Sequence, residues 1–126
     1  MNLSMKDRVA VVTGGSKGIG IAVARRFAES GAKVAILARG AADLAAAREA
    51  LAKDGLVVRD YVCDVAKAAD ISKAHDKIVA DLGGIDVLVN NAGTARTLAF
   101  ESISDEAWQE DLDLKLFAAI RFSRLV

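Results

Sequence analysis

Apolar positions alternate between two spacings along the chain. Four short, nearly continuous apolar runs are typical of buried strands, and they cover 8–13, 33–38, 56–63 and 85–90. Four longer segments repeat apolar residues at helical spacing, namely 19–30, 41–53, 67–82 and 104–126. Glycines at 31, 55 and 83 are placed to end the first three helices. We expect Ile19, Val23 and Phe27 to form the buried face of the first helix.

This alternation predicts a parallel sheet covered by helices on both faces, because a parallel crossover needs a helix-sized connection and right-handed winding. The predicted fold is α/β, with a Rossmann-type doubly wound sheet. Ligands of such sheets bind beyond the carboxyl ends of the strands. The loop after the first run, Arg39, Asp64 and Asn90–Gly93 all follow strand ends, so they should share one edge.

The first run leads into the loop Gly14-Gly-Ser-Lys-Gly-Ile-Gly20. Glycines allow tight turns and close approach to a ligand, and the N-terminus of the following helix attracts anions. This is therefore a candidate pyrophosphate site. A Walker P-loop is excluded because Lys17 precedes Gly18 and no Gly-Lys-Ser/Thr occurs, and the Gly-x-Gly-x-x-Gly spacing is also absent. On the loop alone, a plain strand-to-helix connection stays open.

Composition narrows the class of protein. The chain has 126 residues, 53% of them hydrophobic and 27% charged, as expected for one globular domain. Seventeen basic and seventeen acidic residues cancel, so nothing global favours nucleic acid or an anionic membrane surface. No apolar run has the length of a membrane span. The single cysteine, Cys63, excludes an internal disulfide and favours the cytoplasm, and His75 has no second ligand at metal-binding spacing.

Three motifs together resemble the classical short-chain dehydrogenases/reductases. Thr13–Gly20 resembles that family's Thr-Gly-x-x-x-Gly-x-Gly loop, Cys63-Asp64-Val65 its adenine-contacting segment, and Asn90–Gly93 its Asn-Asn-Ala-Gly motif. The resemblance covers essentially the whole chain and implies a nicotinamide dinucleotide cofactor. The implied cofactor-binding residues are Gly14, Ser16, Lys17, Gly18, Ile19, Gly20, Arg39, Asp64, Val65, Asn91, Ala92 and Gly93.

The end of the second predicted strand points to NADP(H) in preference to NAD(H). An NAD site normally has a carboxylate there, whereas this chain has Arg39. A guanidinium pairs well with a 2′-phosphate, and Lys17 is a second nearby cation. The alternatives are a solvated arginine and an ordinary surface lysine.

The family's catalytic Ser and Tyr-x-x-x-Lys do not occur in this chain. Its one tyrosine, Tyr61, is followed four residues later by Val65. Where the family carries an Asn that supports a proton relay, this chain has Lys115, which either disturbs that relay or is a snorkelling helix residue. We therefore expect residues 1–126 to be the N-terminal cofactor-binding portion of a longer single-domain enzyme, inactive alone. The resemblance implies a small carbonyl or alcohol substrate. A non-catalytic nucleotide-binding or interaction module is the alternative.

The last predicted helix carries an apolar stripe that we expect to be core. It consists of Trp108, Leu112, Leu116, Ala119 and Ile120. In the family the corresponding helix also packs between subunits, which implies a homodimer or homotetramer for the full-length protein. Without the remaining strands and helices, we expect an open sheet edge and an exposed apolar patch, and hence association.

Overall fold

The structure is a computed structural model of the chain, and it describes residues 3–94 and 99–126. Four parallel strands form one sheet in the order β3-β2-β1-β4. The strands are β1 (Val9–Thr13), β2 (Lys33–Ala38), β3 (Val58–Val62) and β4 (Val87–Val89). The helices are α1 (Gly18–Glu29), α2 (Ala41–Lys53), α3 (Ala68–Leu82), α4 (Asp105–Leu112) and α5 (Ala118–Leu125), with a short 3-10 turn at Phe100–Ser102. The predicted doubly wound α/β fold is confirmed.

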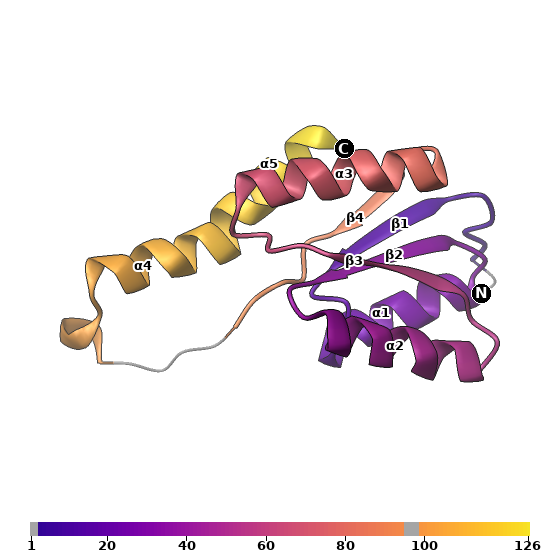
Figure 1. Cartoon of the computed structure of the whole chain (residues 1–126), viewed down its shortest axis with the longest axis horizontal. Coiled ribbons are helices and arrows are strands. Elements are labelled where there is room, and N and C mark those ends of the chain that lie inside the picture. Colours follow the sequence, from indigo (N-terminus) through magenta and orange to yellow (C-terminus); the bar gives the residue numbers. More distant parts are fainter. Residues whose placement is uncertain (1–2, 95–98) are drawn as a thin grey trace.

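The sheet lies between two helical layers, α1 and α2 on one face and α3 and α5 on the other (Figure 1). Side chains alternate along each strand, so neighbouring residues enter different cores. Val11 and Leu37 point into the core beneath α3 and α5, whereas Val12 and Ile36 point into the core beneath α1 and α2. All four are completely buried, which explains why the strands are apolar almost throughout.

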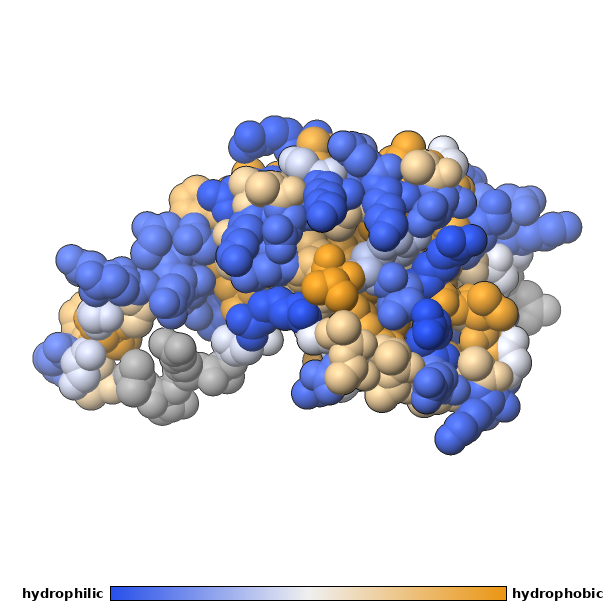
Figure 2. Space-filling model, in the orientation of Figure 1, coloured by the Kyte–Doolittle hydropathy of each residue, from blue (hydrophilic) through white to orange (hydrophobic). Residues whose placement is uncertain are grey.

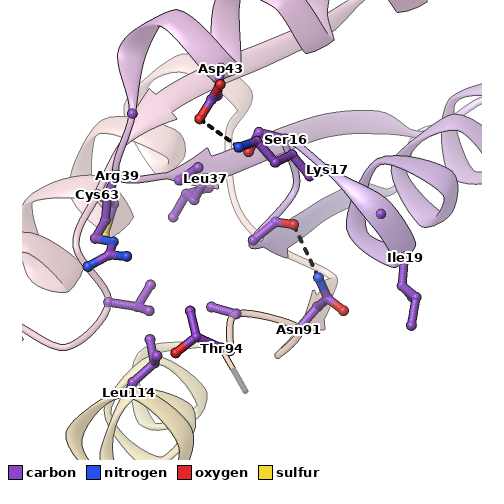
Figure 3. Close-up of a pocket in the computed structure, with 17 residues that line it drawn as sticks. Ser16, Lys17, Ile19, Leu37, Arg39, Asp43, Cys63, Asn91, Thr94 and Leu114 are labelled. Atoms are coloured by element: carbon purple, nitrogen blue, oxygen red, sulfur yellow. Dashed lines mark hydrogen bonds and ion pairs between the residues drawn. The ribbon is translucent and has the colours of Figure 1, made fainter. Parts of the chain in front are cut away.

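The buried face of α1 differs from the expectation. Ile19 is 75% exposed, and the residues that are buried are Gly20 and Ala24. Phe27 is only partly buried against the core. The physical reason is the close contact between Gly20 and the backbone of Gly14, which puts Gly20 on the buried side of α1 and leaves the neighbouring Ile19 exposed. Figure 3 shows the Ile19 side chain pointing away from the other labelled residues.

The predicted helix 104–126 is interrupted by a π-helical turn, Asp113–Phe117. The first part of this helix, α4, begins after Ser104. The Ser104 side chain accepts a hydrogen bond from the backbone N–H of Ala107, as an N-cap does. The extra residue in a π-turn rotates the helix beyond it, and this rotation brings Ala118 and Phe122 into the core beside α3.

The apolar stripe of this helix is not core. Trp108, Leu112, Leu116 and Ile120 are 42%, 39%, 48% and 40% exposed. That part of the expectation is wrong, because the core instead takes up the face that carries Ala118 and Phe122. Within the described residues the stripe is instead exposed, which agrees with the exposed apolar patch that was also expected from the sequence. Figure 1 shows α4 extending away from the three-layered body formed by the sheet and the helices on its two faces.

Candidate functional site

A hollow lies at the carboxyl edge of the sheet. It measures about 560 Å³ and is lined by the loops that follow all four strands, together with Leu114 of the π-turn (Figure 3). The strand order reverses between β1 and β4, so the loops after these two strands diverge on either side of the sheet. Such a switch point is where doubly wound sheets bind their ligands.

Glycines shape the loop between β1 and α1. Gly14 has φ +62°, in the left-handed region that favours glycine. A Cβ on Gly20 would collide with the carbonyl oxygen of Gly14. The side-chain amide of Asn91 donates a hydrogen bond to the same carbonyl oxygen, with Nδ2 and O 3.1 Å apart. The loop is thus fixed against the segment after β4.

Open space remains on the pocket side of this loop. A Cβ on Gly18 would meet no atom within 4 Å, and Gly18 begins helix α1. The free backbone N–H groups of a first helical turn favour an anion at this end. The cradle therefore fits a pyrophosphate in shape and in electrostatics.

Thr13 joins the two loops at the switch point. Its side chain is buried, and its hydroxyl donates to the carbonyl oxygen of Val89 at 3.3 Å. The same hydroxyl oxygen accepts from the backbone N–H of Asn91 at 3.0 Å and from that of Ala92 at 3.1 Å. A hydroxyl can donate one hydrogen bond and accept two, so every hydrogen-bonding position of the Thr13 side chain is occupied.

The segment after β3 is held by its own polar groups. The Asp64 carboxylate accepts from the backbone N–H of Ala66 at 3.0 Å, and the Asp70 carboxylate accepts from that of Asp64 at 3.1 Å. From α5, the Arg121 guanidinium donates to the carbonyl oxygen of Ala66 at 3.3 Å. This places the buried side chain of Val65 in the wall of the pocket.

Cys63 also lines the pocket but is almost fully buried. Burial, with the negative charges of Asp70 and Asp64, raises the pKa of its thiol to about 12. The thiol is therefore protonated and unreactive at neutral pH.

Two cations stand at the mouth of the pocket on different loops. Arg39 follows β2 and has no hydrogen bond or ion pair to any residue of 3–94 or 99–126. Lys17, in the glycine loop, has its Nζ 3.2 Å from Oδ2 of Asp43 in the first turn of α2 (Figure 3). Both ends of this pair are largely exposed, at 74% and 53%. Of the two, Arg39 is the cation already available to an incoming anion.

The fold gathers most of the predicted binding residues around one space. Those that line the pocket are Gly14, Ser16, Lys17, Gly18, Ile19, Arg39, Val65, Asn91, Ala92 and Gly93. Gly20 lies beneath the loop, where it shapes the turn. Asp64 lines a neighbouring hollow that it shares with Arg39 and α4, and Figure 2 shows the molecule hollowed between α4 and its main body.

Asp43 and Leu114 line the pocket although the sequence did not single them out. Asp43 carried one signal in the sequence, because it is an acidic residue in the first turn of a helix that begins shortly after the strand-end Arg39. Leu114 had no such signal, because the sequence contains no pattern of residue types that predicts the π-turn in which it lies.

The two residues compared with the family's catalytic groups lie outside this pocket. Lys115 sits in the π-turn with its Nζ 2.9 Å from Oδ1 of Asp111, and its side chain is half exposed. Tyr61 is buried and donates to the Asp81 carboxylate at 2.8 Å. Burial and the neighbouring Asp81 raise the pKa of Tyr61 to about 12.

Over 3–94 and 99–126, no cluster of three or more His, Cys, Asp or Glu side chains could hold a metal ion. Over the same ranges, no helix combines the length and the apolar character needed to cross a membrane.

Comparison with known proteins identifies close relatives. A sequence model of the family described as short chain dehydrogenase matches residues 8–126. D-threitol dehydrogenase from Mycolicibacterium smegmatis is 39% identical over 112 residues, which are 89% of this chain and 43% of the relative. The chain thus spans about half the length of the curated relatives it matches.

Solved structures agree with the fold. L-sorbose reductase from Gluconobacter frateurii, complexed with NADPH and L-sorbose, has a TM-score of 0.94 and 35% identity, covering 100% of this chain and 48% of its own. A short chain dehydrogenase from Burkholderia cenocepacia in complex with NADP has a TM-score of 0.90 and 31% identity, covering 98% of this chain and 51% of its own.

Proposed function

Because this chain belongs to the short-chain dehydrogenase family, we propose that it forms the cofactor-binding portion of an oxidoreductase and binds NADP(H) in preference to NAD(H). The observation that carries the proposal is the pocket at the carboxyl edge, with an open glycine loop on one side and, on the other, Arg39, which is unpaired among the described residues. The bound nicotinamide would supply or accept a hydride. The substrate is a small molecule with a carbonyl or alcohol group.

Each part of the pocket suits one part of such a dinucleotide. Gly14–Gly20 would hold the pyrophosphate, because the loop is open at Gly18 and α1 begins there. Val65 would pack against the adenine, with Asp64 beside it. Asn91–Gly93 would lie along the ribose on the nicotinamide side. Arg39 would bind the 2′-phosphate through two or more of its donors, as guanidinium groups bind phosphate.

Residues 1–126 would then be the N-terminal portion of a single nucleotide-binding domain. They lack the family's Ser and Tyr-x-x-x-Lys, and Tyr61 lies outside the pocket with its hydroxyl on Asp81. The chain by itself is therefore proposed to bind the cofactor without catalysing hydride transfer. Lys115 is held by Asp111 on the helix surface, which favours a surface role for it over a part in a proton relay.

Two further properties belong to the same proposal. The exposed stripe of Trp108, Leu112, Leu116 and Ile120 supports assembly of the full-length protein into a homodimer or homotetramer. The single, free and buried Cys63 supports a cytoplasmic location.

Calorimetric titration of the purified chain with NADPH and NADH at matched salt tests the proposal. We expect tighter binding of NADPH, and we expect Arg39→Asp to weaken it about tenfold to hundredfold while NADH binding changes little, since a charge-assisted hydrogen bond contributes about 1.5–3 kcal/mol. Lys73→Glu, an equal change of charge on an exposed residue of α3 outside the pocket, is the matched control and should have little effect.

Two results would count against the proposal. Equal losses in Arg39→Asp and Lys73→Glu would mean that only overall charge matters. A folded chain that binds neither nucleotide would favour the interaction module instead.

A further inference from the structure

The pair between Lys17 and Asp43 joins two elements across the mouth of the pocket. Lys17 belongs to the glycine loop and Asp43 to the first turn of α2, and both line the pocket together with Arg39 (Figure 3). The Asp43 carboxylate lies back over the turn that follows Arg39, since its Oδ2 is 3.3 Å from the position of a Cβ on Gly40. A negative group therefore pairs with Lys17 and lies beside the turn that follows Arg39.

The charged residues at this end of the pocket include a carboxylate as well as two cations. Arg39 and Lys17 contribute two positive charges, and Asp43 removes one of them through a contact of 3.2 Å. A 2′-phosphate carries a charge of about −1.5 to −2 at neutral pH, so it is repelled by the carboxylate. It is attracted fully only by the cation without an ion-pair partner among the described residues, Arg39.

We propose that Asp43 is a specificity-determining residue that reduces the preference for NADP(H) by holding Lys17 away from the 2′-phosphate. The inference rests on the proposed function and refines it. When a 2′-phosphate enters, Lys17 exchanges Asp43 for the phosphate, and Asp43 is left beside a dianion. When the ribose has a free 2′-hydroxyl, the pair stays intact and Asp43 offers an acceptor for that hydroxyl.

The expected size of the effect is modest, because both side chains are largely exposed. An exposed ion pair contributes little to stability, so its exchange for a phosphate is easily reversible. Repulsion between the carboxylate and the phosphate acts through solvent and is screened by salt. Removal of the Asp43 charge should therefore tighten binding of the phosphorylated nucleotide about threefold to tenfold at low salt, and less at high salt.

The test compares 2′,5′-ADP with 5′-AMP, which differ only in the 2′-phosphate, by calorimetry on the full 126-residue chain. Asp43→Asn keeps the shape of the side chain and removes its charge. We expect 2′,5′-ADP to bind about threefold to tenfold more tightly to this variant, and 5′-AMP to bind equally well or more weakly. In a Lys17→Met background the gain from Asp43→Asn should shrink, because the double-mutant cycle isolates what acts through Lys17.

The matched control is Asp54→Asn, at the other end of the same helix. Asp54 pairs with Arg25 at 2.7 Å in another exposed contact, and neither residue lines the pocket. An equal gain in this control would overturn the inference, because the effect would then be one of net charge. Weaker binding of 2′,5′-ADP in Asp43→Asn would also overturn it, since Asp43 would then be positioning Lys17 for the phosphate.

Failure of the proposed function has a different signature. In that case the unmutated chain binds neither NADPH nor NADH, and the inference falls with it. If the unmutated chain prefers NADPH and Asp43→Asn leaves 2′,5′-ADP binding unchanged, only the role of Asp43 is refuted.

Discussion

Replacement of Thr13 by Val removes one hydroxyl and almost nothing else, so its cost can be worked out from three hydrogen bonds. The backbone N–H of Ala92 loses its partner at 3.1 Å and gains no other among the described residues. The N–H of Asn91 keeps a second acceptor, the carbonyl oxygen of Val89 at 3.1 Å. That carbonyl in turn loses only the hydroxyl at 3.3 Å.

One unpaired donor costs about 1–3 kcal/mol, and each shared bond adds at most about 1 kcal/mol. These figures sum to about 1–5 kcal/mol. Since Ala92 lines the pocket and water can reach it in part, we expect a value in the middle of that range, a loss of about 2–3 kcal/mol in the free energy of unfolding. With a urea m-value of about 1.5 kcal/mol/M, the midpoint moves down by about 1.3–2 M.

Urea unfolding followed by circular dichroism and by the fluorescence of Trp108 measures this loss, and coincident transitions justify a two-state treatment. Thr13→Ser is the control, because it keeps the hydroxyl and loses one methyl group, which costs about 1 kcal/mol. Thr13→Val should therefore be the less stable variant. If Thr13→Val is as stable as Thr13→Ser or more so, the hydroxyl does not join the two loops.

Two further predictions concern the glycine loop and pH. Gly20→Ala places a Cβ against the carbonyl oxygen of Gly14, so the turn must shift, and urea unfolding should show a loss of about 3 kcal/mol or more. Gly18→Ala meets only the strain of φ +54° and should cost about 1–2 kcal/mol, and equal losses would contradict the steric argument. Tyr61 and Cys63 have pKa values of about 12 in the folded protein, above their ordinary 10.0 and 9.0, so the folded state keeps protons that the unfolded chain releases. The free energy of unfolding should therefore fall as pH rises from about 9 to 12, less steeply in Cys63→Ala, and a flat profile would refute this.

The sequence predicted the elements well where an apolar run and a stop signal coincide. The run 33–38 and the helix 41–53 have the predicted bounds, because Gly55 follows the second and the first is apolar at every position after Lys33. The strand predicted at 85–90 is shorter, Val87–Val89, since only those residues pair with β1. Strand ends depend on the neighbouring strand, which local sequence does not contain.

Within the candidate site, the sequence identified the residues that a loop must contain for steric reasons. The backbone favours glycine at positions 14, 18 and 20, through a positive φ or a close contact. Such steric demands can be recognised from the sequence of the loop alone. The sequence also placed Arg39 at a strand end, where a parallel sheet presents it to a ligand.

The tertiary structure decided which charges and apolar groups meet. Lys17 and Asp43 lie 26 positions apart, and their contact exists because the turns after β1 and β2 emerge side by side from neighbouring strands. The exposed stripe on α4 and α5 depends in the same way on the π-turn and on the core it packs against. Local sequence determines what a backbone segment can do, whereas the electrostatics and packing of the site depend on the sheet order that brings distant segments together.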